Sequence, residues 1–211
     1  MRKADIERKT KETSISLRLV LDGKATRDIE LLPATHPGRA RVHREHETGL
    51  GFLDHMLDLL AHHSGISLVI RAKGDTHVDD HHLVEDVGIV LGEAIKQALG
   101  KKEGIARYGW AVVPMDEALV MCAVDLGGRP QLCYGLELPA KRVKDFDTQL
   151  IEEFLRALVN AAGMNLHLRQ LAGRNTHHII EAAFKAFARA LAQAVEKSAR
   201  VRGVPSTKGV L

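Results

Sequence analysis

Two short segments of the chain share a pattern of side chains that can bind metal ions. Residues 81–85 and residues 177–181 both read His-His-x-x-Glu, and each begins a stretch patterned as an amphipathic helix. In each copy the first His and the Glu are four residues apart, so on a helix they share a face and can reach one ion together. The second His is turned about 100° around the helix axis and cannot easily serve that ion. If two copies face each other, each ion takes a His–Glu pair from one copy and the extra His from the other, which predicts two ions between two similar helices. The candidate ligands are His81, His82, Glu85, His177, His178 and Glu181.

The motif belongs to a longer internal repeat. Residues 12–23 and 117–128 both begin with Glu, continue as a β-rich strand and reach Gly eleven residues later. The later matched segments are 52–57 with 150–155, 66–72 with 164–171, and the glycine turns at Gly74 and Gly173. Each half therefore reads strand, strand, helix, strand, helix. This order predicts an α+β fold that is internally duplicated, with two subdomains that are each a small β-sheet covered by two helices. We expect the repeats to span residues 1–104 and 105–211.

Local patterns indicate which faces are buried. Apolar residues alternate along residues 15–21, as expected of a strand with one buried face. Ile180, Phe184 and Leu191 recur at helical spacing and form a stripe that should face the core. Residues 33–48 are polar, carry two prolines and have no counterpart in the second half. We expect them to form an exposed insertion in which His36, His43 and His46 are solvated.

The composition limits the classes of function. The chain has 211 residues, of which 45% are hydrophobic and 27% charged, enough for one large or two small domains. Its net charge of +3 suits a small anionic substrate, and 4% aromatic residues offer little base stacking, so we expect no nucleic-acid partner. There is no apolar run of membrane-spanning length and no apolar signal region, so we expect no membrane partner and a cytoplasmic location. Cys122 and Cys133 read as buried apolar side chains in a reducing compartment.

Several blocks of the sequence resemble one enzyme family in content and order. They are RKTKET (8–13), GFLDHML (51–57), DDHHLVEDVG (79–88), DLGGRP (125–130), NLHLRQLAGRNTHHIIEAAFKAFARAL (165–191) and PSTKG (205–209). Together they resemble the monofunctional imidazoleglycerol-phosphate dehydratases, nearly from end to end. The resemblance implies a lyase that removes water from D-erythro-imidazole glycerol phosphate and gives imidazole acetol phosphate in histidine biosynthesis.

The resemblance also implies two manganese ions (Mn2+) per active site. One ion would be held by His55, His82, His177 and Glu181, and the other by His81, Glu85 and His178 with a further ligand from position 153. Some family members have His there, whereas this chain has Glu153. A carboxylate is a hard oxygen donor that can also bind manganese, and the alternative for Glu153 is a solvent-facing position beside Glu152. The implied sets agree with the crossed arrangement expected from the motif.

Catalytic and substrate-binding residues follow from the same resemblance. Glu12 is the acid–base candidate beside the reacting carbons, able to protonate the departing hydroxyl and then to take the proton of the next carbon. With both ring nitrogens on metal, the substrate ring would be an imidazolate, which can expel hydroxide. The family implies a homo-oligomer of 24 subunits whose active sites are shared between neighbours. The substrate-binding residues that the resemblance implies are Glu12, Arg107, Arg129, Lys185, Ser206, Thr207 and Lys208. Of these, the patch of Ser206, Thr207 and Lys208 resembles the family's phosphate contact, and the guanidinium of Arg129 also suits phosphate.

Two other classes of protein would also use such a motif. A dinuclear metal-dependent hydrolase of a small phosphate ester would have two ions bridged by His and carboxylates, but it predicts an Asp-rich ligand set, and here the acidic candidates are Glu on helices. A metal-storage protein would not need the cations Arg107, Arg129 and Lys208. Ultraviolet detection of the product ketone distinguishes the dehydratase from both.

Overall fold

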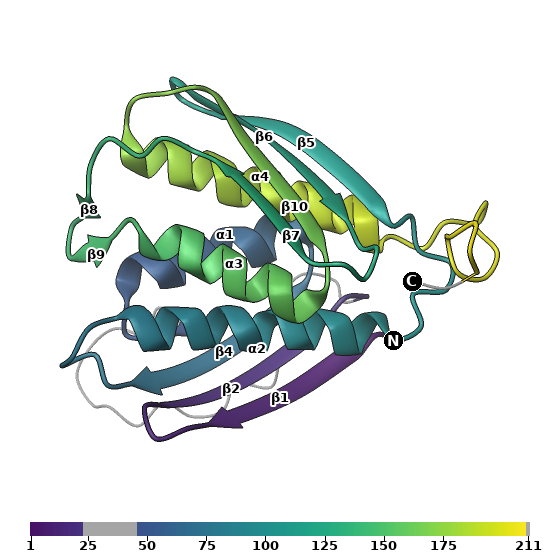
Figure 1. The fold of residues 1–211 in the computed structure, drawn as a ribbon, viewed down its shortest axis with the longest axis horizontal. Helices are drawn as coiled ribbons and strands as arrows, with labels where there is room; N and C mark the ends of the chain where they lie inside the picture. The colour runs from purple at the N-terminus through teal and green to yellow at the C-terminus, as the bar shows by residue number, and fades with distance from the viewer. Residues whose placement is uncertain (23–45, 210–211) are drawn as a thin grey trace.

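The computed structural model describes residues 1–22 and 46–209, over which it has four helices and ten strands (Figure 1). The first half contributes β1 (Lys3–Lys9), β2 (Thr13–Val20), β3 (His46–Glu47), α1 (Gly51–Ser64), β4 (Ser67–Gly74) and α2 (His81–Leu99). The second half contributes β5 (Tyr108–Met115), β6 (Ala118–Asp125), β7 (Gln131–Gly135), β8 (Arg142–Val143), β9 (Phe146–Asp147), α3 (Leu150–Ala162), β10 (Asn165–Ala172) and α4 (Thr176–Val195). The predicted order of strands and helices is confirmed in both halves, with the short strands β3 and β7 to β9 in addition.

Each half builds one four-stranded sheet. The strand order is β1-β2-β4-β3 in the first sheet and β5-β6-β10-β7 in the second. In both sheets the last strand is parallel to its neighbour and the other pairs are antiparallel. Ile15, Leu17 and Leu19 on β2 are 2%, 3% and 1% exposed, and the residues between them are exposed, which is the alternation expected. The two sheets repeat one topology, as a duplicated chain would.

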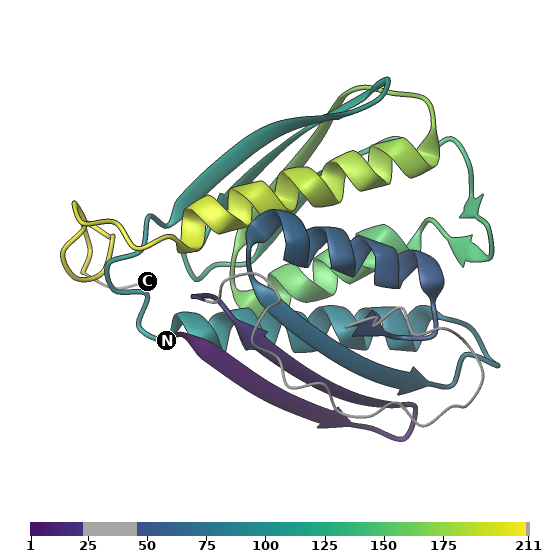
Figure 2. The same cartoon turned by 180° about the vertical axis from the view of Figure 1, so that it is seen from behind.

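The helices lie between the two sheets (Figures 1 and 2). α2 packs on β1 and β2, and α4 packs on β5 and β6. The helices also pair across the halves, because α2 packs against α3 and α1 against α4. Gly92 permits the first pairing, since a Cβ there would lie 2.4 Å from the carbonyl oxygen of Leu158. The α+β architecture is confirmed and the halves share one hydrophobic core. The boundary at residues 104 and 105 lies between α2 and β5 and stays a prediction.

The segment expected to be an exposed insertion ends earlier than predicted. His46 and Glu47 pair with β4, and Thr48 is only 3% exposed, so residues 46–48 belong to the folded body. The cause is Asp54 in the first turn of α1, which accepts hydrogen bonds from the backbone N–H and the hydroxyl of Thr48 at 2.9 and 2.7 Å. The rest of the segment, with His36 and His43, and the side chain of His46 lie outside the described residues.

The two cysteines differ in burial. Cys122 is buried in the centre of the second sheet, and burial raises the pKa of its thiol. Cys133 is only half-buried, which corrects the expectation, because β7 is an edge strand with a neighbour on one side only. Neither forms a disulfide.

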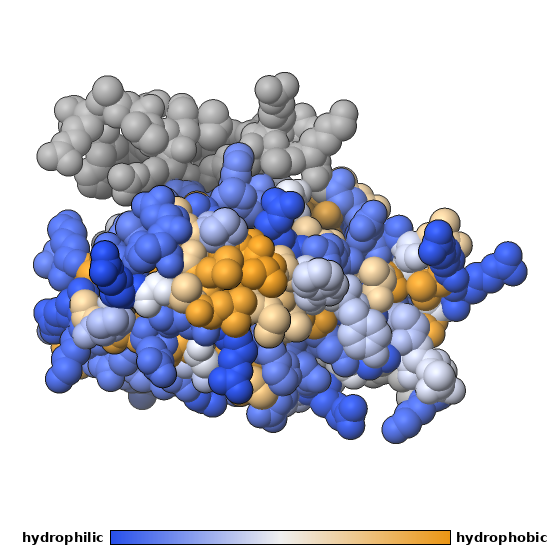
Figure 3. Space-filling view, turned by 90° about the horizontal axis from the view of Figure 1, so that it is seen from above, coloured by the Kyte–Doolittle hydropathy of each residue, from blue (hydrophilic) through white to orange (hydrophobic). Residues whose placement is uncertain are grey.

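The outer face of the second sheet is apolar in its middle. Trp110 and Val112 on β5 and Leu171 on β10 are 68%, 41% and 55% exposed. The alternation of side chains and the register of β5 with β6 place Trp110 and Val112 on one face, and Leu171 lies at a β-bulge near the end of β10. Figure 3, which looks at the molecule from the side of this sheet, shows apolar side chains gathered there. Among the described helices none is both long and apolar enough to cross a membrane.

Candidate active site

The two His-His-x-x-Glu segments form the first turns of α2 and α4, as predicted. The side chain of Asp79 accepts from the backbone N–H of His81 at 2.8 Å, and the side chain of Asn175 accepts from that of His177 at 2.9 Å. These acceptors satisfy backbone donors that a helix start leaves unpaired, and so they fix where each motif begins. Both helices start at the same end of the molecule (Figure 1), which we call the metal end.

Three of the predicted metal ligands converge at this end. His55 on α1 and His177 and Glu181 on α4 each offer an atom within 4.8 Å of the others. Glu181 Oε2 lies 3.2 Å from His177 Nε2 and 3.5 Å from His55 Nε2. Burial opposes ionisation of Glu181, but Lys185, at 2.6 Å, and the two histidines outweigh burial and lower the pKa of the carboxyl. A charged carboxylate beside two imidazole nitrogens, without Cys, fits a divalent cation.

The first motif has the same internal geometry. His81 Nε2 and Glu85 Oε2 lie 3.9 Å apart, and 42% and 47% of the two side chains are exposed. In each copy, therefore, the first His and the Glu do share a helix face. Glu153 lies half-buried on α3 and does not belong to the three-residue group, so its role as a ligand stays a prediction.

The second His of each motif contacts a carboxylate that the sequence analysis did not single out. His82 Nδ1 lies 3.2 Å from Asp75, whose hydrogen bond raises the pKa of His82. His178 Nδ1 lies 2.7 Å from Glu117. That contact, followed by the backbone N–H of Asn175, lowers the pKa of Glu117 to about 2. Glu117 could have been noticed in the sequence, because it occupies the place of Glu12 in the repeat.

The crossed ligand sets do not form within one chain. α2 and α4 lie on opposite sides of the helical layer, with α1 and α3 between them (Figures 1 and 2). Neither His82 nor His178 belongs to the group made by His55, His177 and Glu181 in the described part of the chain. A crossed site would therefore need the second His from another copy of the chain.

Glu12 lies at the metal end, in the turn between β1 and β2. Its Oε2 is 4.0 Å from His82 Nδ1, and 55% of its side chain is exposed. Thr10 closes the turn, because its hydroxyl accepts from the backbone N–H of Glu12 at 3.1 Å and from that of Thr13 at 2.9 Å. The candidate acid–base residue is thus an accessible carboxylate on a short, hydrogen-bonded turn.

A buried carboxylate ties this turn to α2. The hydroxyl of Thr13 donates to Asp86 Oδ2 at 2.5 Å, and Arg8 Nε donates to Asp86 Oδ1 at 2.9 Å. Thr13 and Asp86 are 3% and 8% exposed. Since Asp86 directly follows Glu85, the helix that carries one His–Glu pair also holds the turn that carries Glu12.

The other residues expected to bind the substrate lie at two places. Lys185 is at the metal end, paired with Glu181. The backbone N–H of Arg107 donates to the carbonyl oxygen of Ala194, near the end of α4. Ala194 lies about 25 Å along the helix axis from His177. The Arg107 guanidinium donates to Asp125 at 2.7 and 3.1 Å and to the carbonyl of Pro205 at 2.9 Å. This far end also carries Arg129, Thr207 and Lys208, which are exposed, and Ser206, which is half-buried.

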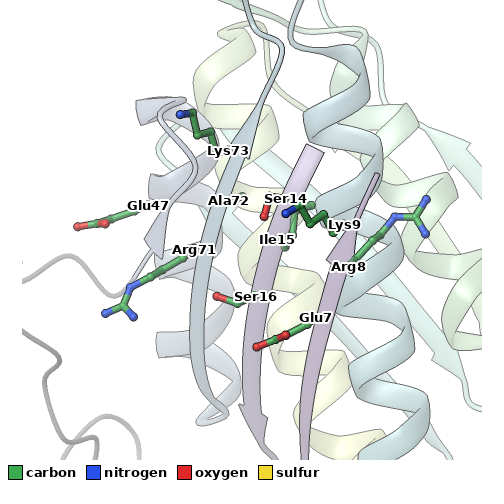
Figure 4. A pocket seen from close by; sticks show the side chains of 10 residues that line it. All are labelled: Glu7, Arg8, Lys9, Ser14, Ile15, Ser16, Glu47, Arg71, Ala72 and Lys73. Atoms are coloured by element: carbon green, nitrogen blue, oxygen red, sulfur yellow. The ribbon is translucent and has the colours of Figure 1, made fainter. Parts of the chain in front are cut away.

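A hollow of about 570 Å³ lies on the outer face of the first sheet (Figure 4). It is lined mainly by polar side chains of β1, β2 and β4, among them Lys9, Ser14, Arg71 and Lys73. It contains none of the predicted metal ligands. The ligand geometry at the metal end, and not this hollow, therefore guides the assignment of function.

Comparison with known proteins decides the family. The family model described as imidazoleglycerol-phosphate dehydratase matches residues 48–191. The chain belongs to this family. A dehydratase of this name from Desulforamulus reducens is 56% identical over 210 residues, covering 100% of this chain and 98% of that protein. The chloroplastic dehydratase of Pisum sativum is 50% identical over 211 residues, covering 100% of this chain and 69% of that protein.

Solved structures of the family share the fold. The crystal structure of the Staphylococcus aureus dehydratase is 38% identical with a TM-score of 0.75, covering 93% of this chain and 99% of that one. The dehydratase of Pyrococcus furiosus, in complex with (S)-C348, is 36% identical with a TM-score of 0.76, covering 98% and 100%. Membership in the imidazoleglycerol-phosphate dehydratases makes the chain a hydro-lyase of histidine biosynthesis and confirms the resemblance seen in the sequence. The hydrolase and metal-storage alternatives are set aside.

Proposed function

We propose that this dehydratase acts with two manganese ions held between neighbouring copies of the chain. The observation that carries the proposal is the convergence of His55, His177 and Glu181 at the start of α4. One ion would take these three residues together with His82 of another copy. The second would take His81 and Glu85 with His178 of another copy, and Glu153 is the candidate for its further ligand.

The distance between the predicted metal ligands and the predicted substrate-binding residues near Arg107 supports a site that is shared between copies of the chain. Arg107 lies about 25 Å from the metal end along α4, too far for one small substrate to reach both within one chain. The cations of the far end would instead approach the metal end of a neighbour. Arg107 holds Pro205 and thereby positions Ser206, Thr207 and Lys208, which with Arg129 and Lys185 would bind the substrate phosphate.

Each residue of the site then has a defined task in the loss of water. When bound, the metal ions would supply Lewis acidity to the imidazole ring and fix its position. Glu12, in its proton-bearing form, would protonate the departing hydroxyl, so that water leaves. The carboxylate formed would then take the proton from the neighbouring carbon, and the resulting enol becomes the ketone. The phosphate-binding cations would hold the carbon chain between the two ends of the substrate.

The apolar face of the second sheet supports assembly into a homo-oligomer. Trp110, Val112 and Leu171 expose apolar surface of the kind that another protein chain covers. We propose that copies of this chain cover it in a particle of 24 subunits.

The name of the Pisum sativum relative includes the word chloroplastic, so the cytoplasmic location remains a prediction.

The substitution Glu12→Gln tests the proposed chemistry. It keeps the size of the side chain and removes the titratable group, so kcat should fall by roughly 10²-fold or more. Substrate binding should survive, because the metals and the cations hold the two ends of the substrate. Product absorbance measures turnover and calorimetry measures binding. Glu7→Gln, an exposed carboxylate on β1, is the matched control and should keep full activity. A Glu12→Gln enzyme with near-normal kcat but weak binding would reassign Glu12 to substrate positioning.

A further inference from the structure

The repeat places two glutamates at equivalent positions, yet they make different contacts. Glu12 directly precedes β2, and Glu117 directly precedes β6. Each faces the second His of the motif in its own half. The distance from Glu12 Oε2 to His82 Nδ1 is 4.0 Å, too long for a hydrogen bond, whereas Glu117 Oε2 lies 2.7 Å from His178 Nδ1.

The residue after the glycine turn explains the difference. In the first half Gly74 is followed by Asp75, whose carboxylate lies 3.2 Å from His82 Nδ1. His82 therefore has a carboxylate partner other than Glu12. In the second half Gly173 is followed by Arg174, which offers no carboxylate. Glu117 contacts the histidine in its place.

Glu117 is also committed through its second oxygen. Oε1 accepts from the backbone N–H of Asn175 at 2.8 Å and from that of Arg174 at 3.2 Å, so the side chain bridges the segment before α4 and His178. Each carboxylate oxygen of Glu117 thus has its own contact: Oε2 with His178, and Oε1 with the backbone before α4. A glutamine at this position would offer an acceptor for only one of them.

We propose that Glu117 is a positioning residue that orients His178 as a metal ligand, and that the two repeats have divided the roles of their equivalent glutamates. A carboxylate that accepts the Nδ1–H of an imidazole fixes the tautomer and leaves Nε2 as the ligand atom. His178 Nε2 lies 3.7 Å from Asp116, beyond hydrogen-bond distance, and so remains available to an ion. Because Asp75 contacts His82 in the first half, the carboxylate of Glu12 is available for the acid–base step. The inference rests on the proposed dimanganese function.

The test compares Glu117→Gln, Glu117→Ala and Glu12→Gln by manganese affinity and by turnover. The protein is titrated with manganese in a calorimeter, and bound metal is counted by elemental analysis. Both Glu117 variants should bind one of the two ions about 10- to 100-fold more weakly than the unchanged protein, the usual effect of losing such a partner, and keep the other. Excess manganese should restore their turnover. Glu12→Gln should keep both affinities and lose turnover that excess manganese does not restore.

Asp116→Asn is the matched control. Asp116 is the neighbouring carboxylate, 70% exposed, and asparagine also tolerates its positive φ of 47°. It should leave both manganese affinities unchanged. Glu117→Gln is isosteric and keeps the test valid if Glu117→Ala does not fold.

The outcomes separate the inference from the function on which it rests. If the unchanged protein binds two ions and forms product, but Glu117→Gln binds both ions with normal affinity, the inference is overturned and the proposed function stands. If the unchanged protein binds no manganese, the proposed function itself fails.

Discussion

Replacing Thr13 by valine removes one hydroxyl from beside the turn that carries Glu12 and leaves the side-chain volume nearly unchanged. That hydroxyl donates to Asp86 at 2.5 Å in a buried setting. A hydrogen bond to a charged group contributes about 1.5–3 kcal/mol. Arg8 still donates to the same carboxylate at 2.9 Å, so Asp86 is not left unpaired. We therefore expect Thr13→Val to lower the free energy of unfolding by about 1.5–2 kcal/mol, the lower part of that range.

The larger effect should be on catalysis. Without its link to α2 the turn can shift, and a displacement of about 1 Å in a reacting group can cost about 10²-fold in rate. We expect kcat of Thr13→Val to fall by about 10- to 100-fold, with little change in KM, because the metals and the phosphate contacts are untouched. Thr13→Ser keeps the hydroxyl and should restore most of the activity.

Thr148→Val provides the matched control. Thr148 is 5% exposed, and its hydroxyl donates to the carbonyl of Ala140 at 2.9 Å, a neutral acceptor. The expected loss of unfolding free energy is about 0.5–1.5 kcal/mol, with normal kcat. Urea unfolding should be followed at a fixed protein concentration and a fixed manganese concentration, because both concentrations shift the apparent stability. A Thr13→Val enzyme with normal kcat, or a Thr13→Ser enzyme as slow as Thr13→Val, would refute the reasoning.

Three further predictions concern the metals and the packing. His82→Ala and His178→Ala should each abolish turnover, because each removes the crossing ligand of one ion; two tightly bound manganese ions per chain in either variant, by elemental analysis, would exclude the crossed sets. Chelation should remove activity and shift the protein to smaller particles, since metal binding would contribute to assembly, and an unchanged large particle in light scattering after complete metal removal would contradict this. Gly109→Ala should lower the free energy of unfolding by about 1–3 kcal/mol or prevent folding, because its Cβ would lie 1.8 Å from the carbonyl oxygen of Ala190 in α4. Gly51→Ala, where a Cβ meets nothing within 4 Å, is its control and should unfold at the same urea concentration as the unchanged protein.

Features that depend on one element were readable in the sequence. The rise and turn of a helix place His177 beside Glu181 whatever the rest of the chain does, and the structure has them 3.2 Å apart. The alternation on β2 and the order of elements in the two halves were set in the same local way. The repeat even marked Glu117 as the counterpart of Glu12, although the sequence did not say that its contacts would differ.

Distances between elements were decided only by the tertiary structure. That His55 joins His177 and Glu181 depends on α1 packing against α4, and this contact is far from local in the chain. The packing also places the cations near Arg107 at the opposite end from the motif, ties Thr13 to Asp86, and buries Thr48 under Asp54. Backbone geometry fixes spacing within a helix or strand, whereas the separation of two elements follows from how all the side chains between them fill the core. A sequence pattern read one element at a time carries the first kind of information and not the second.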